Sequence, residues 1–165
     1  VILSLLLFTF KAATRIKAVR MVRRDDGRFE FAELPDQLPS NEVTAMEFVG
    51  TVYFASVYSY DDLLPDFKDT RNAVLILNMR GRQTIFETSV EFAEKFVPKL
   101  HAAGNQLMLC NVSDEVLAQI EVTDAYELIG EENIFRSSPI IGASLEEAWQ
   151  AAEKWIADRQ EQRES

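Results

Sequence analysis

Two short, uninterrupted apolar runs constrain the fold of this 165-residue chain more than any other feature of its sequence. The first is AVLIL within residues 72–79, and the second is QLMLC within residues 106–111. Such runs are typical of strands buried on both faces, as in a parallel sheet covered by helices. Residues 87–103 lie between them with apolar side chains at helical spacing, and Gly104 follows as a stop signal. The sequence therefore predicts a β-α-β unit at the centre of the protein.

The amino-terminal half reads mainly as strands joined by turns. Asp25-Asp26-Gly27 is a turn signal between two alternating stretches, and it predicts a hairpin. Gly50 interrupts a later stretch rich in β-branched and aromatic residues, as at a bend or bulge. The elements expected here are a hairpin over residues 15–34, a loop over 34–41, a strand over 42–56 and a short helix over 59–69.

The carboxyl-terminal half continues the alternation of strands and helices. Ser113 is expected to cap a helix, and Ser144 with Glu147 is expected to form a capping box for the last helix. The other expected elements are a helix that ends before Gly130, a strand over 133–136 and a core face made by Leu145, Ala148, Trp149, Ala152, Trp155 and Ile156. The order predicts an α/β fold, a mixed β-sheet with a parallel core flanked by about four α-helices.

The first 24 residues join an apolar run to a basic cluster. Residues 1–10 read VILSLLLFTF, and the six cations that follow precede the first acidic residue, Asp25. A secretory signal has the opposite order, and ten residues are too few to span a bilayer. Apolar residues followed by Lys and Arg are typical of the cytoplasmic exit of a membrane helix. We therefore expect residues 1–14 to be the cytoplasmic end of a last transmembrane helix and a basic neck, with an ordinary core segment as the alternative.

The remaining chain divides into one domain over residues 15–157 and a charged, flexible tail over 158–165. Its charge is strongly acidic. Of the 17 Lys and Arg, six stand in the first 24 residues, so 11 remain against all 27 Asp and Glu. A domain with this balance is repelled by phosphate backbones, which excludes nucleic acid as an expected partner. The basic neck, in contrast, would be attracted to an anionic lipid surface.

Sequence motifs for catalysis are not found. Cys110 and His101 are each the only residue of their kind, which leaves no disulfide framework and no His-based or Cys-rich metal site to predict. Cys110 stands in an apolar run and is expected to be a small buried residue. No phosphate-binding glycine motif, zinc-protease motif or nucleophile elbow occurs. We therefore expect no enzyme activity, no metal and no cofactor.

One loop has the position of a functional site. Residues 80–89 (RGRQTIFETS) follow the first buried strand and lead into a helix, and α/β sheets place their sites at such carboxyl ends. Thr88 and Ser89 offer hydroxyls beside a helix dipole that favours anions. The alternative is that Thr88 or Ser89 serves only as the helix N-cap.

Three segments make the chain resemble a STAS domain, a fold named after sulfate transporters and anti-sigma factor antagonists. They are FVGTVYFASV, then the stretch from NAVLILNMRGRQTIFETS to NVSDEVLAQIE, then EENIF. In that family an Asp-Ser-Ser/Thr-Gly-Leu-like segment opens a helix, and residues 86–90 correspond to it here. Phe86 replaces the family's Asp, Glu87 its first Ser and Ser89 its Gly. Thr88 remains as the matched hydroxyl, and Glu87 would supply a permanent negative charge.

The neck and the segment GTVYFAS at residues 50–56 are similar to SulP-type anion transporters, which resemble solute carrier 26 proteins and carry a STAS domain after their last membrane helix. The resemblance implies a cytoplasmic regulatory and assembly domain at the cell membrane, without the transport site. Its partners would be the membrane domain of the same polypeptide, a second copy, and a regulatory protein or small ligand. A cyanobacterial bicarbonate transporter or a sulfate transporter would be the parent.

Two other functions stay open. A soluble STAS protein of the anti-sigma factor antagonist kind would be switched by phosphorylation at Thr88 or Ser89. A flavodoxin-like enzyme or nucleotide binder would need a phosphate-binding motif that the sequence lacks. For the assembly role, the expected interface consists of large aromatic residues near the neck and the first strands, with burial in the core as the alternative. The candidates are Phe29, Phe31, Phe48, Tyr53 and Phe54.

Overall fold

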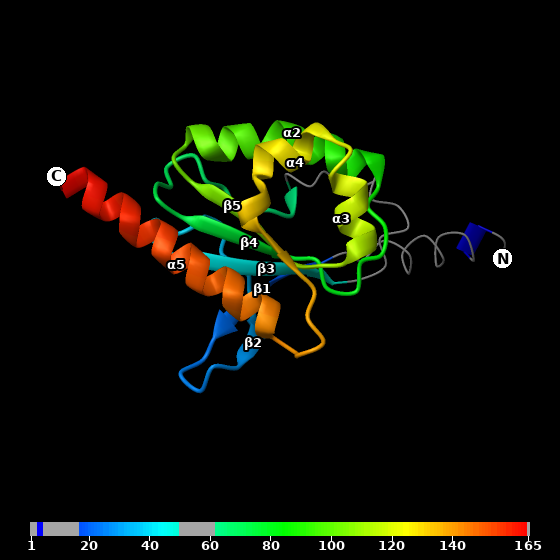
Figure 1. The fold of residues 1–165 in the computed structure, drawn as a ribbon, viewed down its shortest axis with the longest axis horizontal. Helices are drawn as coiled ribbons and strands as arrows, with labels where there is room; N and C mark the ends of the chain where they lie inside the picture. The colour runs from blue at the N-terminus through cyan, green and yellow to red at the C-terminus, as the bar shows by residue number, and fades with distance from the viewer. Residues whose placement is uncertain (1–2, 5–16, 50–61, 165) are drawn as a thin grey trace.

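A computed structural model describes residues 3–4, 17–49 and 62–164, with side chains as far as residue 162 (Figure 1). The six strands form one sheet with the order β2-β1-β3-β4-β5-β6. The strands are β1 (Lys17–Arg23), β2 (Phe29–Ala32), β3 (Val43–Val49), β4 (Val74–Asn78), β5 (Gln106–Val112) and β6 (Ile134–Arg136). The helices are α2 (Glu87–Ala102), α3 (Asp114–Ile120), α4 (Asp124–Ile129), the 3-10 helix η3 (Glu131–Asn133) and α5 (Ala143–Glu164).

The sheet is mixed, as the sequence predicts. β3, β4, β5 and β6 are parallel, whereas β1 runs antiparallel to both β2 and β3. Four α-helices lie among the described residues. The predicted fold class, a mixed sheet with a parallel core flanked by about four α-helices, is therefore confirmed.

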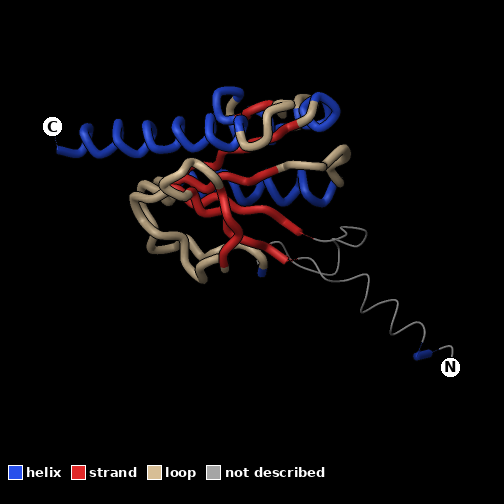
Figure 2. Tube along the Cα trace, turned by 90° about the horizontal axis from the view of Figure 1, so that it is seen from below, coloured by secondary structure: helices blue, strands red, loops and turns tan. Residues whose placement is uncertain are grey.

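Helices cover both faces of the sheet (Figures 1 and 2). Each face has its own hydrophobic core. α2 and α4 pack over one face with α3 beside them, and α5 crosses the other. Central strands have side chains buried on both faces, which explains why their sequences do not alternate. The first core is centred on Met46, Leu75, Val97, Leu100, Leu109 and Val116. The second is centred on Ala45, Ile76, Met108, Cys110, Leu145 and Ala152.

The predicted hairpin forms with the expected turn. The Arg24 amide donates to the Arg28 carbonyl at 2.8 Å, and Gly27 has a φ of 78°. A positive φ at this position suits glycine, which has no Cβ to clash with the backbone. The hairpin packs back onto α5 through a tilted contact between the rings of Phe29 and Trp149, whose centroids are 5.8 Å apart.

Of the helix expected over residues 59–69, residue 62 is in a 3-10 turn, whereas residues 63–69 are not helical. Residues 63–69 are turns that include a bridge between Gln37 and Asp66. The Asp66 amide donates to the Asp36 carbonyl, and the Leu38 amide donates to the Asp66 carbonyl, both at 2.8 Å. Because these bonds to a distant loop occupy the backbone groups of Asp66, tertiary structure overrides the apolar spacing that indicated a helix. Residues 59–61 lie outside the described residues, as does the bend expected at Gly50.

The two expected helix caps have different outcomes. Ser113 caps α3 as predicted, because its hydroxyl accepts from the Val116 amide at 3.2 Å. Ser144 does not head a capping box with Glu147, because α5 already begins at Ala143. Its hydroxyl instead accepts from the Asn111 amide of β5 at 2.8 Å. α5 continues to Glu164, so residues 158–164, expected to be a flexible tail, are helical.

Candidate functional site

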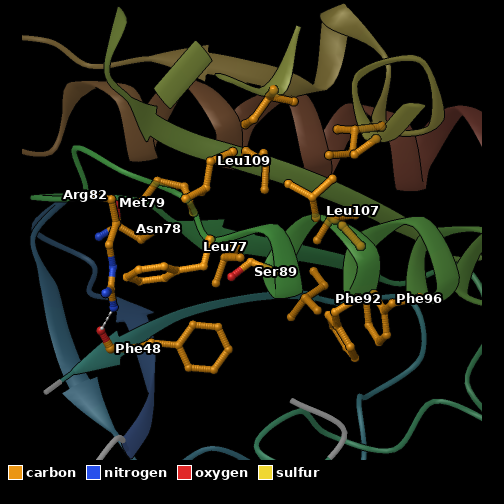
Figure 3. Close-up of a pocket in the computed structure, with 18 of the residues that line it drawn as sticks. Phe48, Leu77, Asn78, Met79, Arg82, Ser89, Phe92, Phe96, Leu107 and Leu109 are labelled. Atoms are coloured by element: carbon orange, nitrogen blue, oxygen red, sulfur yellow. Dashed lines mark hydrogen bonds between the residues drawn. The ribbon is translucent and has the colours of Figure 1, made fainter. Parts of the chain in front are cut away.

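The loop that joins β4 to α2 lies at the carboxyl edge of the parallel strands. Neighbouring elements hold it through its backbone and through Arg82. The Arg82 guanidinium donates to the Phe48 carbonyl at 2.8 Å, as Figure 3 shows. Gln119 of α3 makes two further bonds, accepting from the Ile85 amide at 3.1 Å and donating to the Gln83 carbonyl at 3.0 Å. These contacts fix the start of α2 relative to β3 and α3.

The three predicted site residues lie together in the first turn of α2, but they differ in accessibility. Glu87 and Thr88 are exposed, whereas Ser89 is half-buried and lines a cavity under the loop. The N-cap residue of α2 is Phe86, whose own side chain forms no cap hydrogen bond. The alternative interpretation of Thr88 or Ser89 as the N-cap is therefore wrong. Glu87 places a carboxylate where the helix dipole favours negative charge.

The cavity under the loop has a volume of about 150 Å³ and an almost wholly apolar wall (Figure 3). Phe92 and Phe96 form part of this wall, with rings that stack at a centroid separation of 5.2 Å. Other apolar wall residues come from β3, β4, β5, α2 and α4, namely Phe48, Leu75, Leu77, Val90, Leu107, Leu109 and Ile129. Such a wall can hold an apolar group of a ligand. Among the described residues, Arg82 is the one charged side chain in the wall that a charged group of a ligand could contact. The sequence does not predict this cavity, although Phe92 and Phe96, four positions apart on one helix, indicate an aromatic face.

A polar network occupies the same edge of the sheet, across strands β3, β4 and β5. The Asn78 side-chain amide donates to the Glu47 carboxylate at 2.7 Å, and the Asn111 side-chain amide donates to Asn78 Oδ1 at 2.8 Å. The Cys110 thiol also faces Asn78 Oδ1, at 3.6 Å. The sequence does not predict this network, because its residues are far apart in the chain and only the strand register aligns them.

Three of the five expected interface residues lie among the described residues, and their surroundings differ. Phe29 packs against Trp149, and Phe48 lines the cavity, so both contribute to packing within the domain. Phe31 is 64% exposed on the outermost strand. Tyr53 and Phe54 lie outside the described residues, together with the rest of the GTVYFAS segment.

The surroundings of Cys110 and of His101 shift the pKa of each side chain. Burial, and next the nearby Glu47 carboxylate, raises the pKa of the Cys110 thiol to about 12. The prediction that Cys110 is a buried structural residue is therefore confirmed. Partial burial lowers the pKa of His101, which stands in the last turn of α2. No group of three or more His, Cys, Asp or Glu that could hold a metal ion occurs among the described residues.

The chain resembles a known protein in its fold, whereas its sequence matches no family. No protein-family model and no curated protein matches the sequence. The structure is similar to that of murine Solute Carrier 26 family member A9, an anion transporter solved in the inward-facing state. The TM-score is 0.61 and the sequence identity 16%, over 93% of this chain. The chain spans 25% of the length of that transporter. The likeness, together with the sheet order, identifies the fold as STAS-like.

Residues 1–14, expected to meet the membrane, lie outside the described residues except for residues 3 and 4. Among the helices that the structure does describe, none combines the length and the apolar character needed to cross a bilayer.

Proposed function

We propose that this chain is the cytoplasmic STAS-like domain of a SulP-type or solute carrier 26-like membrane anion transporter, and that it serves in assembly and regulation. The observation that carries the proposal is the fold similarity to a transporter of which the chain covers only a quarter of the length. The apolar-then-basic order of residues 1–24 agrees with it, since a basic neck would lie where a last membrane helix leaves the bilayer.

On this proposal the domain binds no transported anion. Its site for regulation is the first turn of α2 with the loop before it, where Glu87 and Thr88 are exposed and where an apolar cavity lies beneath Ser89. A regulatory protein or a small ligand would be recognised there. The parent transporter would carry bicarbonate or sulfate. Its membrane domain would bind the transported anion, because this domain is acidic and would repel it.

The experiment is membrane fractionation of the full-length native protein, followed by carbonate extraction and then by uptake of labelled bicarbonate and labelled sulfate. Retention in the extracted pellet, with uptake of one anion above that of cells lacking the protein, is the expected result. Uptake of the other anion is the internal control for leakage. Release of the protein into the soluble fraction would overturn the transporter proposal.

A second candidate function is favoured by the exposure of Thr88 at the start of a helix, where a kinase could reach its hydroxyl. A soluble STAS protein switched by phosphorylation at Thr88 or Ser89 would appear in the soluble fraction of the same experiment. A phosphate-affinity gel of that fraction would then separate wild type from Thr88→Ala and from Ser89→Ala.

A further inference from the structure

The strand β2 forms the outer edge of the sheet on the side of the hairpin (Figure 1). Its edge pairs with no strand among the described residues. Phe29 is half-buried, but Glu30, Phe31 and Ala32 are exposed. A sheet edge with a large exposed apolar side chain is a template for pairing with another chain, unless charges or proline block it.

The hydrogen-bond alternation of the hairpin shows which backbone groups are available at this edge. The Arg24 amide donates to the Arg28 carbonyl at 2.8 Å, and the register continues unbroken to Arg20 and Ala32. Because bonded and non-bonded pairs alternate in an antiparallel ladder, Glu30 and Ala32 direct their amides and carbonyls toward β1. Phe29 and Phe31 direct theirs outward, away from the sheet.

We propose that β2 pairs antiparallel with β2 of a second copy of this chain, about a two-fold axis at Phe31, so that two six-stranded sheets join into one. The inference rests on the proposed assembly function and names the surface that performs it. In this arrangement Phe31 of each copy donates its outward amide to the outward carbonyl of the other. The two Phe31 rings then lie side by side on the same face of the joined sheet.

Charge and the limits of β2 together select this register among those that pair the outward groups. An axis at Phe29 would pair most of β2 with the turn that precedes it. A two-fold axis at Glu30 would place the two Glu30 carboxylates opposite each other, which is destabilising. An axis at Ala32 would pair β2 mostly with the residues that follow it. With the axis at Phe31, Glu30 faces Ala32 of the second copy and Phe29 faces Glu33 of the second copy, so no two like charges are opposed. This self-complementarity favours a second copy over an unrelated partner.

The strand is also held in place before it pairs. Glu30 accepts from the Arg24 guanidinium at 2.7 Å, which partly neutralises its charge beside the edge. The hairpin is fixed to α5 by the Phe29–Trp149 contact and by Arg23, which donates to Glu146 at 2.5 Å. Because these contacts order the strand in the single copy, less conformational entropy is lost when two copies associate.

Disulfide formation between introduced cysteines tests the register directly. The full 165-residue chain is used, purified in mild detergent, and buried Cys110 serves as an unreactive background. Phe31→Cys is expected to form a homodimer disulfide, because the facing Cα atoms would be about 5.5 Å apart. Glu30→Cys and Ala32→Cys are expected to cross-link with each other when mixed, at a Cα separation of about 4.5 Å, and neither with itself.

A charge variant tests the energetics of the same surface. Phe31→Lys would place the ammonium groups of the two copies opposite each other, so it is expected to weaken dimerisation at least about tenfold. Light scattering across a dilution series measures the change. Val122→Lys is the matched control, because Val122 is 84% exposed and lies between α3 and α4, on the side of the sheet opposite α5 and the hairpin. It is expected to leave the dimer unchanged.

The outcomes separate this inference from the proposed function. A dimer that persists in Phe31→Lys and forms no Phe31→Cys disulfide would overturn the β2 pairing and leave assembly through another surface. A wild-type chain that stays monomeric at tens of micromolar would overturn self-assembly altogether. Neither result bears on membrane retention, which is decided by the fractionation experiment.

Discussion

At the scale of the residue, Cys110 shows how its surroundings determine the chemistry of a side chain. It is fully buried in the core under α5, and its thiol lies 3.6 Å from Asn78 Oδ1. Desolvation is the larger cause of its raised pKa, and the Glu47 carboxylate adds to it. Because the thiolate is the reactive form, the folded protein suppresses the reactivity of its single cysteine.

The raised pKa of Cys110 predicts a loss of stability at alkaline pH. The pKa of the thiol is about 12 in the folded state, above its ordinary value of 9.0. The contribution of the protonated thiol to the free energy of unfolding is therefore complete below pH 9.0 and is lost as the pH rises toward 12. Urea denaturation at several pH values across that window should show a steeper fall in the free energy of unfolding for wild type than for Cys110→Ala. Equal slopes would contradict the prediction. Because Cys110→Ala also removes core packing, only the slopes are compared, and not the absolute stabilities.

At the scale of the element, Ser144 joins three elements through one hydroxyl. It accepts from the Asn111 amide of β5 at 2.8 Å and donates to the Phe135 carbonyl of β6 at 3.3 Å, while its own backbone belongs to α5. Asn111 has a φ of 54°, a left-handed conformation in which its amide is directed away from the strand ladder. The hydroxyl of Ser144 therefore satisfies a group that the sheet leaves unpaired.

Ser144→Ala is expected to destabilise the domain by about 1–3 kcal/mol, because the Asn111 amide would be left without its partner in a partly buried position. Urea denaturation measures the change. Ser138→Ala is the matched control, since the Ser138 hydroxyl accepts from the Ile140 amide in an exposed loop. It should cost no more than about 0.5 kcal/mol, as surface substitutions usually do. Equal costs for the two variants would contradict the role given to Ser144.

At the scale of the whole molecule, charge is the dominant feature. The net charge of −10 and the sequence pI of about 4.6 leave the domain with many more carboxylates than cations. Six salt bridges form among the described residues. Four of them lie within the hairpin or join it to α5, through Arg23, Arg24 and Arg28. Most of the acidic residues therefore repel one another across the surface.

Self-repulsion predicts that added salt stabilises the folded chain. The thermal midpoint should rise by a few degrees between about 0.01 M and about 0.3 M salt, because the screening length shortens from about 30 Å to less than 8 Å. Calorimetry or circular dichroism measures the midpoint. Sodium chloride and sodium acetate at equal ionic strength should act alike, since screening does not depend on the anion. A midpoint that falls with salt would show that the surface ion pairs dominate.

The sequence by itself determined the class of fold, because its signals are local. Uninterrupted apolar runs such as AVLIL indicate strands buried on both faces, helical spacing indicates α2, and Asp25-Asp26-Gly27 indicates the hairpin turn. The position of residues 87–89 at the start of a helix also follows from local pattern. These features need no knowledge of which elements touch.

Only the tertiary structure decided how those elements use their polar and aromatic side chains. Asp66 gives its backbone groups to a distant loop and not to a helix, and Ser144 bonds to a strand 33 positions away and not to its own helix end. Phe29, Phe31 and Phe48 look alike in the sequence, yet one packs on Trp149, one is exposed at the sheet edge and one lines the cavity. The physical reason is that hydrogen bonds and burial depend on distances between residues far apart in the chain, and strand register and helix packing set those distances.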